Sequence, residues 1–460
     1  MRIRLSIPLR LSEIAKAAGA VSFSDSNKDT TIEYISTDTR ELCRGDLFIA
    51  LCGKRYNGEE FLAIAKDIGA YTMATRKGAD IRVTSTDIAL LTLASHYKRK
   101  LPIKHIIAIT GSNGKTTTRE LTASLFLSAG AKYHSSEENY NNLIGVSYSV
   151  LSAPADTEYL IIECGMSAKN ELRRISNAIN PTVSVITNIG SSHLSELKTR
   201  ENIASAKLEI LAGMSAPRVI IPNNEPLLAG AYGNTTLSVD SYGGDYAVIS
   251  SRLASGCEYS LMHFSRPLAF VSSALPFCHI KEALGFAFGI YLESGLSKQA
   301  LQGIELPKRL LHTELYEHSG VKILNDSYNS SLESVEYALK TLSLIQAERR
   351  IALLSDTLES ADPPRYHKDI GRAVAKNPPD LLLLYGIYAE YIRAGALASG
   401  FAADKIKIIA EDYREGEVAF ALIKQIMMGD AILIKGSHGT GAYKIAPIVC
   451  EHLKTASADS

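Results

Sequence analysis

The residues from Thr110 to Thr118 are of the types that bind phosphate groups, in the order Thr-Gly-Ser-Asn-Gly-Lys-Thr-Thr-Thr. Glycines let a backbone approach phosphate oxygens closely, and backbone amides at the start of a helix supply positive potential. Lys115 is expected to reach the terminal phosphates, and the hydroxyl of Thr116 is a ligand type that Mg²⁺ accepts. The predicted nucleotide contacts of this loop are Gly111, Ser112, Asn113, Gly114, Lys115, Thr116 and Thr117.

The loop is shorter than the usual phosphate-loop pattern G-x-x-x-x-G-K-[ST], because Ile109 stands where the first glycine would be. A chance Gly-Lys-Thr turn is the alternative interpretation. The surrounding sequence favours the phosphate loop, since the apolar run His105–Thr110 predicts a buried strand before it and a helix is predicted to begin near Thr116. A phosphate loop requires a strand, a glycine-rich turn and a helix in that order.

Two further apolar runs, Tyr159–Glu163 and Thr182–Thr187, have the length of buried strands and end in polar residues. Apolar strands that alternate with helices indicate a parallel α/β sheet. Ligand-binding residues in such sheets lie just past the carboxyl ends of the strands. Gly111, Glu163 and Asn188 occupy that position, so we expect them at one edge of the sheet.

The first hundred residues predict a small mixed domain. A short helix is expected over Leu11–Ala18, a strand over Asp46–Leu51 and a further helix from Phe61. The basic stretch Lys98–Pro102, which ends in a proline, is predicted to be a linker.

The last part of the chain predicts a second doubly wound sheet, because five apolar strands are separated by helical stretches. These strands are Val321–Leu324, Arg350–Leu354, Asp380–Leu384, Lys405–Ile409 and Ala431–Lys435. With 460 residues, and roughly 150 residues per domain, about three domains are expected. We predict an α/β protein with domains at residues 1–100, 101–308 and 309–460.

Composition limits the classes of function. Lysine and arginine number 49, as do aspartate and glutamate, so no excess of cations is available for a general nucleic-acid binder. The six cysteines are scattered without a C-x-x-C pair, which favours reduced thiols in a cytoplasmic protein over a zinc or redox site. Neither a signal peptide nor a membrane span is predicted.

The shortened loop, together with motifs elsewhere in the chain, resembles the Mur ligase family and in particular its MurF type. Asn139-Tyr-Asn-Asn-Leu-Ile-Gly145 resembles the family's asparagine-rich loop after the phosphate-loop helix. Ser36–Arg40, Gly45–Leu51 and Asn57-Gly58 resemble its uridine-nucleotide domain. The remaining matching segments are Glu163–Gly165, Thr187–Gly190 with His193 and Leu194, Ala204–Ile210, Asn325–Asn329 and Lys435–Ser437.

The resemblance implies a three-domain Mur ligase architecture. A small mixed α/β domain would bind a UDP-linked substrate, a central P-loop domain with a parallel sheet would bind ATP, and a C-terminal Rossmann-like domain would bind the incoming amine. The implied activity is ATP-dependent, ADP-forming amide ligation through an acyl phosphate. The implied reaction adds D-Ala-D-Ala to a UDP-N-acetylmuramoyl tripeptide in peptidoglycan synthesis. ATP with Mg²⁺ at two sites, small-molecule partners only, and a cytoplasmic monomer complete this expectation.

The resemblance also implies metal ligands and catalytic residues. Thr116 and Glu163 would hold one Mg²⁺, both being hard oxygen ligands. His193 and Lys207 would hold a second, with Lys207 converted by CO₂ into an anionic carbamate. Lys115, His193 and Lys207 would be the catalytic residues. Without the family, Glu163 is interpreted as a solvated carboxylate at a strand end, His193 as a surface or packing histidine and Lys207 as a helix-face lysine.

Further contacts are implied outside the phosphate loop. Closure of the C-terminal domain would exclude water from the ATP site and bring in nucleotide contacts from Arg309, Asp326 and Asn329. An ordinary polar turn after a strand is the alternative interpretation of these C-terminal residues. Substrate contacts are expected from Thr39, Arg40, Asn141, Asn142, Asp356, Lys435 and Ser437.

Four segments depart from the family pattern. Cys278–Glu282 replaces all three signature residues of the adenine-contacting motif, and Tyr328–Leu332 departs at its last three positions. Ser355–Ala361 keeps Asp356 but loses both family glycines, and His438 replaces an arginine, which substitutes a weaker donor for a bidentate one. Two alternatives therefore stay open: a MurF-like paralogue that joins a different amine or carboxylate, and a nucleotide-binding regulator without catalysis. The intact phosphate and metal residues favour an active ligase.

Overall fold

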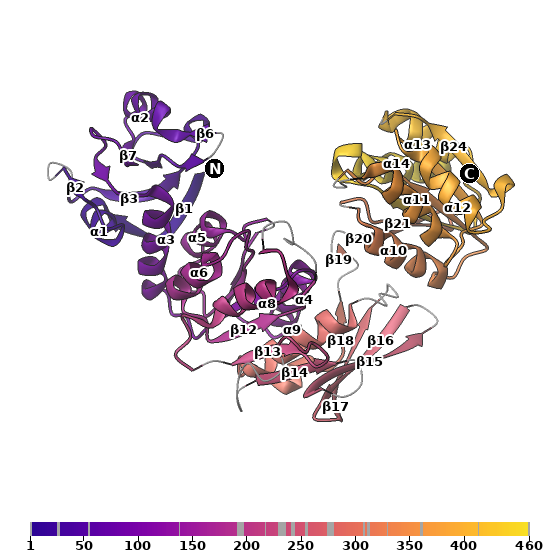
Figure 1. The fold of residues 1–460 in the computed structure, drawn as a ribbon, viewed down its shortest axis with the longest axis horizontal. Helices are drawn as coiled ribbons and strands as arrows, with labels where there is room; N and C mark the ends of the chain where they lie inside the picture. Colours follow the sequence, from indigo (N-terminus) through magenta and orange to yellow (C-terminus); the bar gives the residue numbers. More distant parts are fainter. Residues whose placement is uncertain are drawn as a thin grey trace. The chain divides into compact units, whose positions relative to one another are not determined.

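The computed structural model of the chain describes residues 2–24, 28–53, 56–137, 139–190, 197–216, 218–228, 236–240, 244–253, 256–273, 280–306, 309–310, 313–328, 330–358, 362–412 and 414–458. Helices and strands alternate over most of this length (Figure 1). The described residues contain no helix with the length and apolar character needed to cross a bilayer. The fold divides into two compact units. The first comprises Met1–Ile249, Leu261–Ala269 and Glu282–Gln302, and the second comprises Ser250–Ser260, Phe270–Lys281 and Gly303–Ser460.

A six-stranded sheet occupies the N-terminal part of the first unit. Its strands, in spatial order, are β1 (Arg2–Arg10), β3 (Thr31–Ser36), β4 (Leu47–Ile49), β7 (Tyr71–Ala74), β8 (Ile81–Arg82) and β2 (Ser22–Phe23). The two edge strands run antiparallel to their neighbours, while the four inner strands are parallel. The accompanying helices are α1 (Leu11–Ala17), α2 (Leu62–Ile68) and α3 (Thr86–Tyr97). The predicted helix at Leu11 and the predicted strand after Asp46 are confirmed.

A ten-stranded sheet follows. Its strands, in spatial order, are β10 (Tyr133–Ser135), β11 (Tyr159–Glu163), β9 (His105–Thr110), β12 (Val183–Ile186), β13 (Val219–Pro222), β14 (Thr236–Asp240), β15 (Tyr246–Leu253), β16 (Gly256–His263), β17 (Arg266–Ser273) and β18 (Ile304–Leu306). β9 lies between β11 and β12 and is parallel to both, with Glu163 opposite Ile109 and Ile186 opposite Thr110. The three predicted strands and their common carboxyl edge are confirmed.

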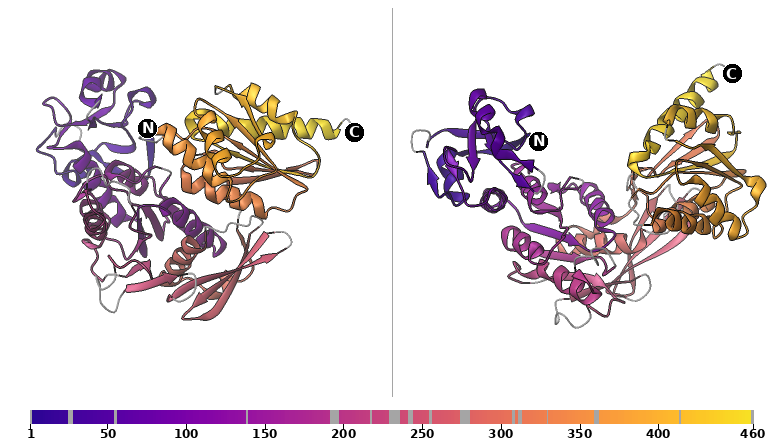
Figure 2. Two further views of the ribbon diagram at one scale, coloured as in Figure 1. Left: turned by 45° about the vertical axis from the view of Figure 1, so that its right-hand side comes forward. Right: turned by 45° about the horizontal axis from the view of Figure 1, so that its top comes forward.

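The strands from β13 to β18 extend the sheet well beyond the part that the sequence predicted (Figure 2). They include three eight-residue strands that hold few long apolar runs, so periodicity alone gave no prediction there. The helices of this part of the chain are α4 (Lys115–Ser128), α5 (Leu143–Leu151), α6 (Glu171–Ile179), α8 (Arg200–Leu208) and α9 (Lys281–Glu293). α4 begins at Lys115, one residue before the predicted start.

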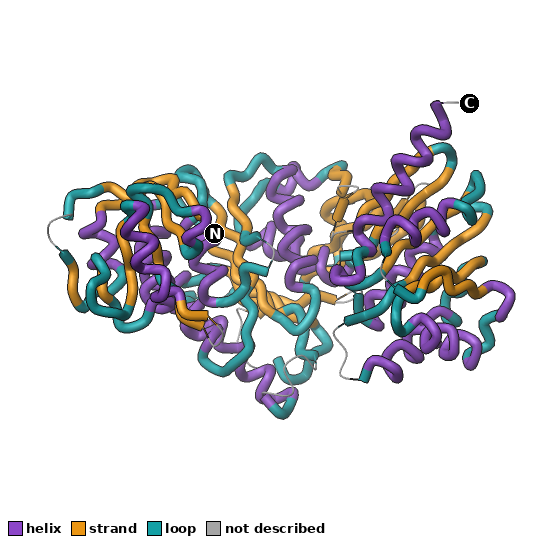
Figure 3. Tube along the Cα trace, turned by 90° about the horizontal axis from the view of Figure 1, so that it is seen from above, coloured by secondary structure: helices purple, strands orange, loops and turns teal. Residues whose placement is uncertain are grey.

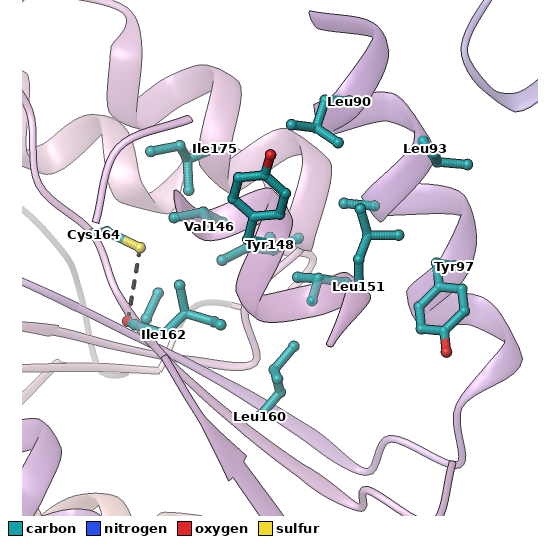
Figure 4. Close-up of a cluster of buried hydrophobic side chains, with 14 of the residues drawn as sticks. Leu90, Leu93, Tyr97, Val146, Tyr148, Leu151, Leu160, Ile162, Cys164 and Ile175 are labelled. Carbon is teal, nitrogen blue, oxygen red and sulfur yellow. Dashed lines mark hydrogen bonds between the residues drawn. The ribbon is translucent and has the colours of Figure 1, made fainter. Parts of the chain in front are cut away.

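One hydrophobic core joins the N-terminal elements to the central ones. Figure 4 shows Leu90 and Leu93 of α3 beside Val146 and Leu151 of α5, and all four side chains are buried. The core continues into β11, where Leu160 and Ile162 are fully buried. This packing fixes α5, and the loop before it, against both parts of the first unit.

The stretch Lys98–Pro102, predicted to be a linker, is packed instead of free. Leu101 is buried, and Lys98 Nζ donates a hydrogen bond of 2.6 Å to the side-chain oxygen of Asn180 at the end of α6. The prediction rested on charge and a proline, and neither reveals that the stem of a lysine can be buried while its amine finds one polar partner.

A seven-stranded sheet forms most of the second unit. In spatial order its strands are β19 (Arg309–Leu310), β20 (Thr313–His318), β21 (Val321–Asn325), β25 (Asp430–Lys435), β22 (Arg349–Leu354), β23 (Leu381–Tyr385) and β24 (Ile406–Ala410). The five predicted strands are confirmed with bounds that shift by one residue or not at all, and they are mutually parallel. The antiparallel pairs formed by β19, β20 and β21 were not predicted.

Helices cover the seven-stranded sheet, with strands lying between two helical groups in Figure 3. One buried cluster packs α13 (Glu415–Ile423) and α14 (Ile445–Ala458) on alternate residues of the strands, including Ile323, Ile351 and Ile432. The other helices of the unit are α10 (Leu332–Leu344), α11 (Pro363–Val374) and α12 (Ala389–Ala398). A doubly wound sheet with an antiparallel edge is the result.

Candidate functional site

The phosphate loop lies between β9 and α4, at the carboxyl edge of the ten-stranded sheet. Gly111 has a φ of 150°, and a Cβ at this position would lie 1.8 Å from the hydroxyl oxygen of Thr187. Gly114 has a φ of 79° and is the N-cap of α4. Side chains are thus excluded at both positions by backbone conformation or by contact, as a phosphate loop requires.

The loop that follows β12 braces the phosphate loop. The side-chain oxygen of Asn188 accepts hydrogen bonds from the amides of Ser112 (3.1 Å) and Asn113 (2.9 Å). The Thr187 hydroxyl donates to the carbonyl oxygen of Asn113 at 2.5 Å, and the Gly190 amide donates to Ser112 Oγ at 2.9 Å. Two amides that were expected to face a phosphate are therefore engaged by Asn188.

The N-terminus of α4 remains available to an anion. Within the part of the chain that the structure describes, no side chain caps this helix, whose N-cap is Gly114. The first amides of a helix have no partner inside it, and they carry the positive end of its dipole. We therefore expect the amides of Lys115, Thr116 and Thr117 to contribute most of the backbone contacts to a phosphate group.

Lys115 folds back over the loop that it follows. Its Nζ donates to the carbonyl oxygens of Gly111 at 3.0 Å and Ser112 at 3.3 Å. Burial lowers the pKa of Lys115 below its ordinary value, and the Glu163 carboxylate partly opposes this effect. The ammonium group thus lies directly beside the backbone that a phosphate would contact.

Thr116 and Glu163, predicted as metal ligands 47 residues apart, are brought together. The Thr116 hydroxyl donates to Glu163 Oε2 at 2.9 Å, and Asn141 Nδ2 donates to Oε1 of the same carboxylate at 3.1 Å. Glu163 is buried, which argues against a solvated strand-end carboxylate. A hydroxyl and a carboxylate beside a phosphate loop are the hard oxygen donors that suit Mg²⁺, so the residues present fit that ion.

Lys207 lies on α8 and is almost fully buried, with 2% of its surface exposed. Burial, together with the smaller effect of the Lys115 charge, lowers the pKa of Lys207 to about 7. Lys207 thus lies on a buried face of the helix and not on its solvent-exposed face. A lysine of this pKa is a neutral amine over much of the physiological range.

Several predicted residues lie outside what the structure describes. His193 and Asn329 fall outside the described residues, as do Cys278 and His279 of the divergent adenine motif. Arg309 begins β19, but its side chain is not described. The roles given to these residues stay predictions.

A cavity of about 660 Å³ opens in the N-terminal part of the first unit. Thr39 and Arg40, both predicted as substrate contacts, line it. The Arg40 guanidinium pairs with Asp38 and holds the pKa of that carboxyl well below its usual range. The rings of Tyr56 and Phe61 stack at 5.8 Å on the cavity wall. The other lining residues include Thr37, Leu51, Cys52, Gly53 and Ile144.

The asparagine-rich loop contributes in two different ways. Asn141 bonds to Glu163, and its carbonyl oxygen accepts from the Gly165 amide at 2.6 Å. Asn142 is the N-cap of α5, and its side-chain oxygen accepts from the Gly145 amide at 2.9 Å. Of the two predicted substrate contacts, Asn142 thus has a clear structural task.

In the second unit, Asp326 and Lys435 lie together after β21 and at the end of β25. Lys435 Nζ lies 3.0 Å from Asp326 Oδ2 and donates to the Asp326 carbonyl oxygen at 3.2 Å. Lys435 is buried, while Asp326 keeps partial access to solvent through a side chain that is 21% exposed. The arrangement holds the aspartate at the carboxyl edge of the sheet.

Asp356, also predicted as a substrate contact, is fully buried in the second unit. Its Oδ2 accepts from the Ile387 amide at 2.9 Å and its Oδ1 from the Tyr388 amide at 3.1 Å, so it caps the start of α12. The nearby Ser437 hydroxyl accepts from the Leu358 amide at 3.0 Å. Both residues organise the backbone at this edge, and for Asp356 the geometry supports no direct substrate contact.

Sequence reasoning missed two residues of the site. Arg119 lies three residues after Thr116 on α4 and packs beside Glu163, with 3.7 Å between its Nε and Oε2. Tyr148 donates from its phenol to Thr37 Oγ1 at the cavity, at 2.6 Å. Helical spacing was the available signal, because residues three or four positions apart share a helix face.

Comparison with known proteins identifies the family. Residues 109–260 match the Mur ligase middle domain, and residues 313–438 match the Mur ligase glutamate ligase domain. The UDP-N-acetylmuramoyl-tripeptide--D-alanyl-D-alanine ligase of Bacillus subtilis (strain 168) is 34% identical over 436 residues, which cover 90% of this chain and 92% of the relative. The chain belongs to the Mur ligase family. The resemblance to its MurF type is confirmed by the same relative.

Solved structures agree. A crystal structure of MurF from Acinetobacter baumannii superposes with a TM-score of 0.84 at 26% identity, covering 98% of this chain and all of that one. MurF from Thermotoga maritima in complex with ADP has the same fold, with a TM-score of 0.75 at 22% identity, covering 92% and 98%. The three-domain Mur ligase architecture predicted from the sequence is thus confirmed.

Proposed function

We propose that this Mur ligase family member is the ATP-dependent, ADP-forming ligase that joins D-Ala-D-Ala to a UDP-N-acetylmuramoyl tripeptide in peptidoglycan synthesis. The observation that carries the proposal is the bond between Thr116 and Glu163 beside an uncapped α4 N-terminus. It unites a phosphate-binding element with the oxygen donors of a magnesium site. The name of the Bacillus subtilis relative supports the choice of substrates.

The first step of such a ligase transfers the γ-phosphoryl group of ATP to a substrate carboxylate, giving an acyl phosphate and ADP. Phosphoryl transfer depends on positioning and charge neutralisation more than on covalent help from the protein. The N-terminus of α4 and the Lys115 ammonium would bind the phosphate oxygens, and Thr116 with Glu163 would hold Mg²⁺. The ion supplies charge neutralisation between the phosphates when it is bound. An incoming amine then displaces phosphate to form the amide.

A carbamate on Lys207, and a second metal site shared with His193, form part of the proposal. A lysine attacks CO₂ only as its neutral amine and releases one proton as the carbamate forms. The pKa of about 7 that burial gives Lys207 supports this modification. The carbamate would then offer an anionic oxygen to the metal, where the unmodified side chain offers none.

The substrates' other ends would lie in the two remaining domains. The cavity lined by Thr39 and Arg40 suits a uridine nucleotide, because it combines stacked aromatic rings with polar groups. Asp326, Lys435 and Ser437 are proposed for the C-terminal nucleotide and amine side, with domain boundaries near residues 100 and 308. A cytoplasmic, monomeric enzyme completes the proposal.

The test is phosphate release from ATP by the purified protein with Mg²⁺ and UDP-N-acetylmuramoyl tripeptide, with and without D-Ala-D-Ala. The proposal expects release that depends on both substrates, together with formation of the UDP-linked pentapeptide by mass spectrometry. Inactivity with these substrates, in a protein that binds ATP and Mg²⁺, would overturn it.

A different amine acceptor is a second candidate, favoured by one observation. His438, which stands where the family has arginine, stacks on Tyr443 at 4.4 Å, and Tyr328 lies 6.0 Å from it. An aromatic group thus replaces a bidentate donor on the exposed side of this region. Phosphate release with other amines, but not with D-Ala-D-Ala, would select this candidate. The non-catalytic regulator corresponds to nucleotide binding without release for any amine.

A further inference from the structure

Arg119 is a buried cation next to the proposed magnesium carboxylate. It lies on α4, one helical turn beyond Thr116, and 8% of its surface is exposed. Its Nη1 donates to the carbonyl oxygen of Ser136, and the Ser136 hydroxyl in turn accepts from the Glu163 amide at 3.0 Å. The guanidinium thus connects α4 to Ser136, just after β10, and through Ser136 to Glu163, the last residue of β11.

The guanidinium faces two carboxylates. Its Nη2 lies 3.4 Å from Glu120 Oε1, and its Nε lies 3.7 Å from Glu163 Oε2. The Glu120 side chain is 23% exposed and the Glu163 side chain only 5%, so solvent screens the pair with Glu163 much less. Coulomb attraction over a given distance strengthens as the local dielectric falls. The attraction to Glu163 is therefore less weakened by solvent than the attraction to Glu120, which is also a hydrogen bond.

One polar atom of Arg119 is left over. Its Nε is buried and has no hydrogen-bond partner among the described residues. A buried donor without a partner is unfavourable, and more so when it is charged. Glu163 Oε2 lies 3.7 Å from this Nε, just beyond hydrogen-bond distance, so a displacement of a few tenths of an ångström would complete the bond.

We propose that Arg119 is a positioning residue that holds the Glu163 carboxylate at the magnesium site. Three side chains hold the carboxylate: Thr116 donates a hydrogen bond to Oε2, Arg119 forms an ion pair with Oε2, and Asn141 donates a hydrogen bond to Oε1. A metal ligand held this way loses little freedom when the ion binds. In this proposal Arg119 acts through Glu163 and not through a contact of its own to ATP or substrate. The inference rests on the proposed function only in taking Glu163 as a magnesium ligand.

A purely structural role is the competing explanation, since the bond to the Ser136 carbonyl alone could anchor β10. The two roles differ in what they change. If Arg119 is only a structural anchor, its substitution lowers the stability of the fold and weakens nucleotide binding equally with and without Mg²⁺. If Arg119 positions Glu163, its substitution weakens only the part of the nucleotide affinity that depends on Mg²⁺.

The experiment measures ADP binding to the full-length protein by calorimetry, in excess Mg²⁺ and in EDTA. Arg119→Met is expected to weaken ADP binding in Mg²⁺, and to raise the Mg²⁺ concentration needed for half-saturation, about tenfold. Binding in EDTA is expected to change less than about twofold, because no contact to ADP is lost. Glu120→Gln is the matched control: it removes the other carboxylate partner of Arg119 and is expected to behave as wild type.

Arg119→Lys serves if the methionine variant does not fold. It keeps the charge but cannot reach Ser136 and Glu163 together, so it is expected to fall between wild type and a full loss of the Mg²⁺ effect. Equal weakening of ADP binding in Mg²⁺ and EDTA, or an unchanged Mg²⁺ requirement in either variant, would overturn the inference. If the wild type fails to join D-Ala-D-Ala to the UDP-N-acetylmuramoyl tripeptide, the proposed function is refuted. The ADP measurement would still decide the role of Arg119.

Discussion

The buried amine of Lys207 makes a prediction about the pH at which CO₂ can modify the protein. With a pKa of about 7 in place of the ordinary 10.5, Lys207 is neutral at a far lower pH than an exposed lysine. At pH 7.5 about three-quarters of the Lys207 amines would be neutral, against about 0.1% of ordinary lysines. The neutral fraction that can react with dissolved CO₂ is therefore several-hundred-fold larger for Lys207 than for an ordinary surface lysine at this pH.

The assay follows carbamate formation by ¹³C NMR after the addition of ¹³C-labelled CO₂, without Mg²⁺ or nucleotide. At a fixed concentration of dissolved CO₂, the initial rate is proportional to the neutral fraction of the amine. The rate is expected to rise about tenfold per pH unit below pH 7 and to level off above it. For an ordinary lysine, the rate of carbamate formation would continue to rise up to about pH 10.5.

Two variants make the experiment specific. Lys207→Met is expected to lose the signal, and what remains reports the N-terminal amine and surface lysines. Lys115→Met removes the neighbouring charge that helps to depress the pKa of Lys207, so the levelling-off is expected to move to higher pH. The move should be partial, because burial is the larger cause. A rate that still climbs tenfold per pH unit between pH 8 and 9, or a signal as strong in Lys207→Met as in wild type, would refute the reasoning.

Three further predictions follow from single side chains. Lys115→Ala should reduce phosphate release at least about 100-fold with an unchanged circular dichroism spectrum, and normal turnover would contradict the phosphate-loop assignment. Burial lowers the pKa of Lys98 to about 8 in the fold, so the unfolded chain binds more protons between pH 8 and 10.5, and wild type should gain stability relative to Lys98→Met as pH rises through this window. Urea unfolding checks this, and a pH-independent difference would count against it. Asp356→Ala should lower the free energy of unfolding by about 2 kcal/mol through the lost cap of α12, with the KM for the amine unchanged. A raised KM at unchanged stability would restore Asp356 to the substrate site.

The elements that the sequence predicted correctly have strong local signals. β9, β11 and β23 consist almost wholly of apolar residues, since both faces of a parallel sheet are covered. β15, β16 and β17 alternate apolar and polar residues irregularly and depend on their neighbours for stability. Such strands are recognisable only once the sheet that they extend is known.

Within the site, residues that belong to a sequence motif could be predicted. Residues whose role depends on contacts made in the folded chain could not. The phosphate loop, Glu163 and Lys207 occur in recognisable segments. Asn188 was expected at the correct edge, but its bonds to two loop amides depend on how β12 lies against β9. Asp356 shows the reverse: it stands in a matching segment, yet full burial gives it a capping role.

The asparagine-rich segment shows why spacing in this chain carries functional meaning. Asn142 caps α5 and so fixes where the helix begins, and Gly145 allows close packing, because a Cβ there would lie 2.4 Å from the Cα of Tyr140. With the start fixed, Ile144 and Tyr148 fall four residues apart on one helix face, which meets the cavity and Thr37.

Asn141, one residue before that cap, bonds to the Glu163 carboxylate. The same segment of about ten residues therefore sets both a wall of the N-terminal cavity and one anchor of the proposed metal ligand. An insertion or deletion within it would rotate Ile144 and Tyr148 by about 100° per residue relative to Asn141 and so separate the two tasks. The geometry of the site thus depends on the length of this segment as much as on the identity of its asparagines.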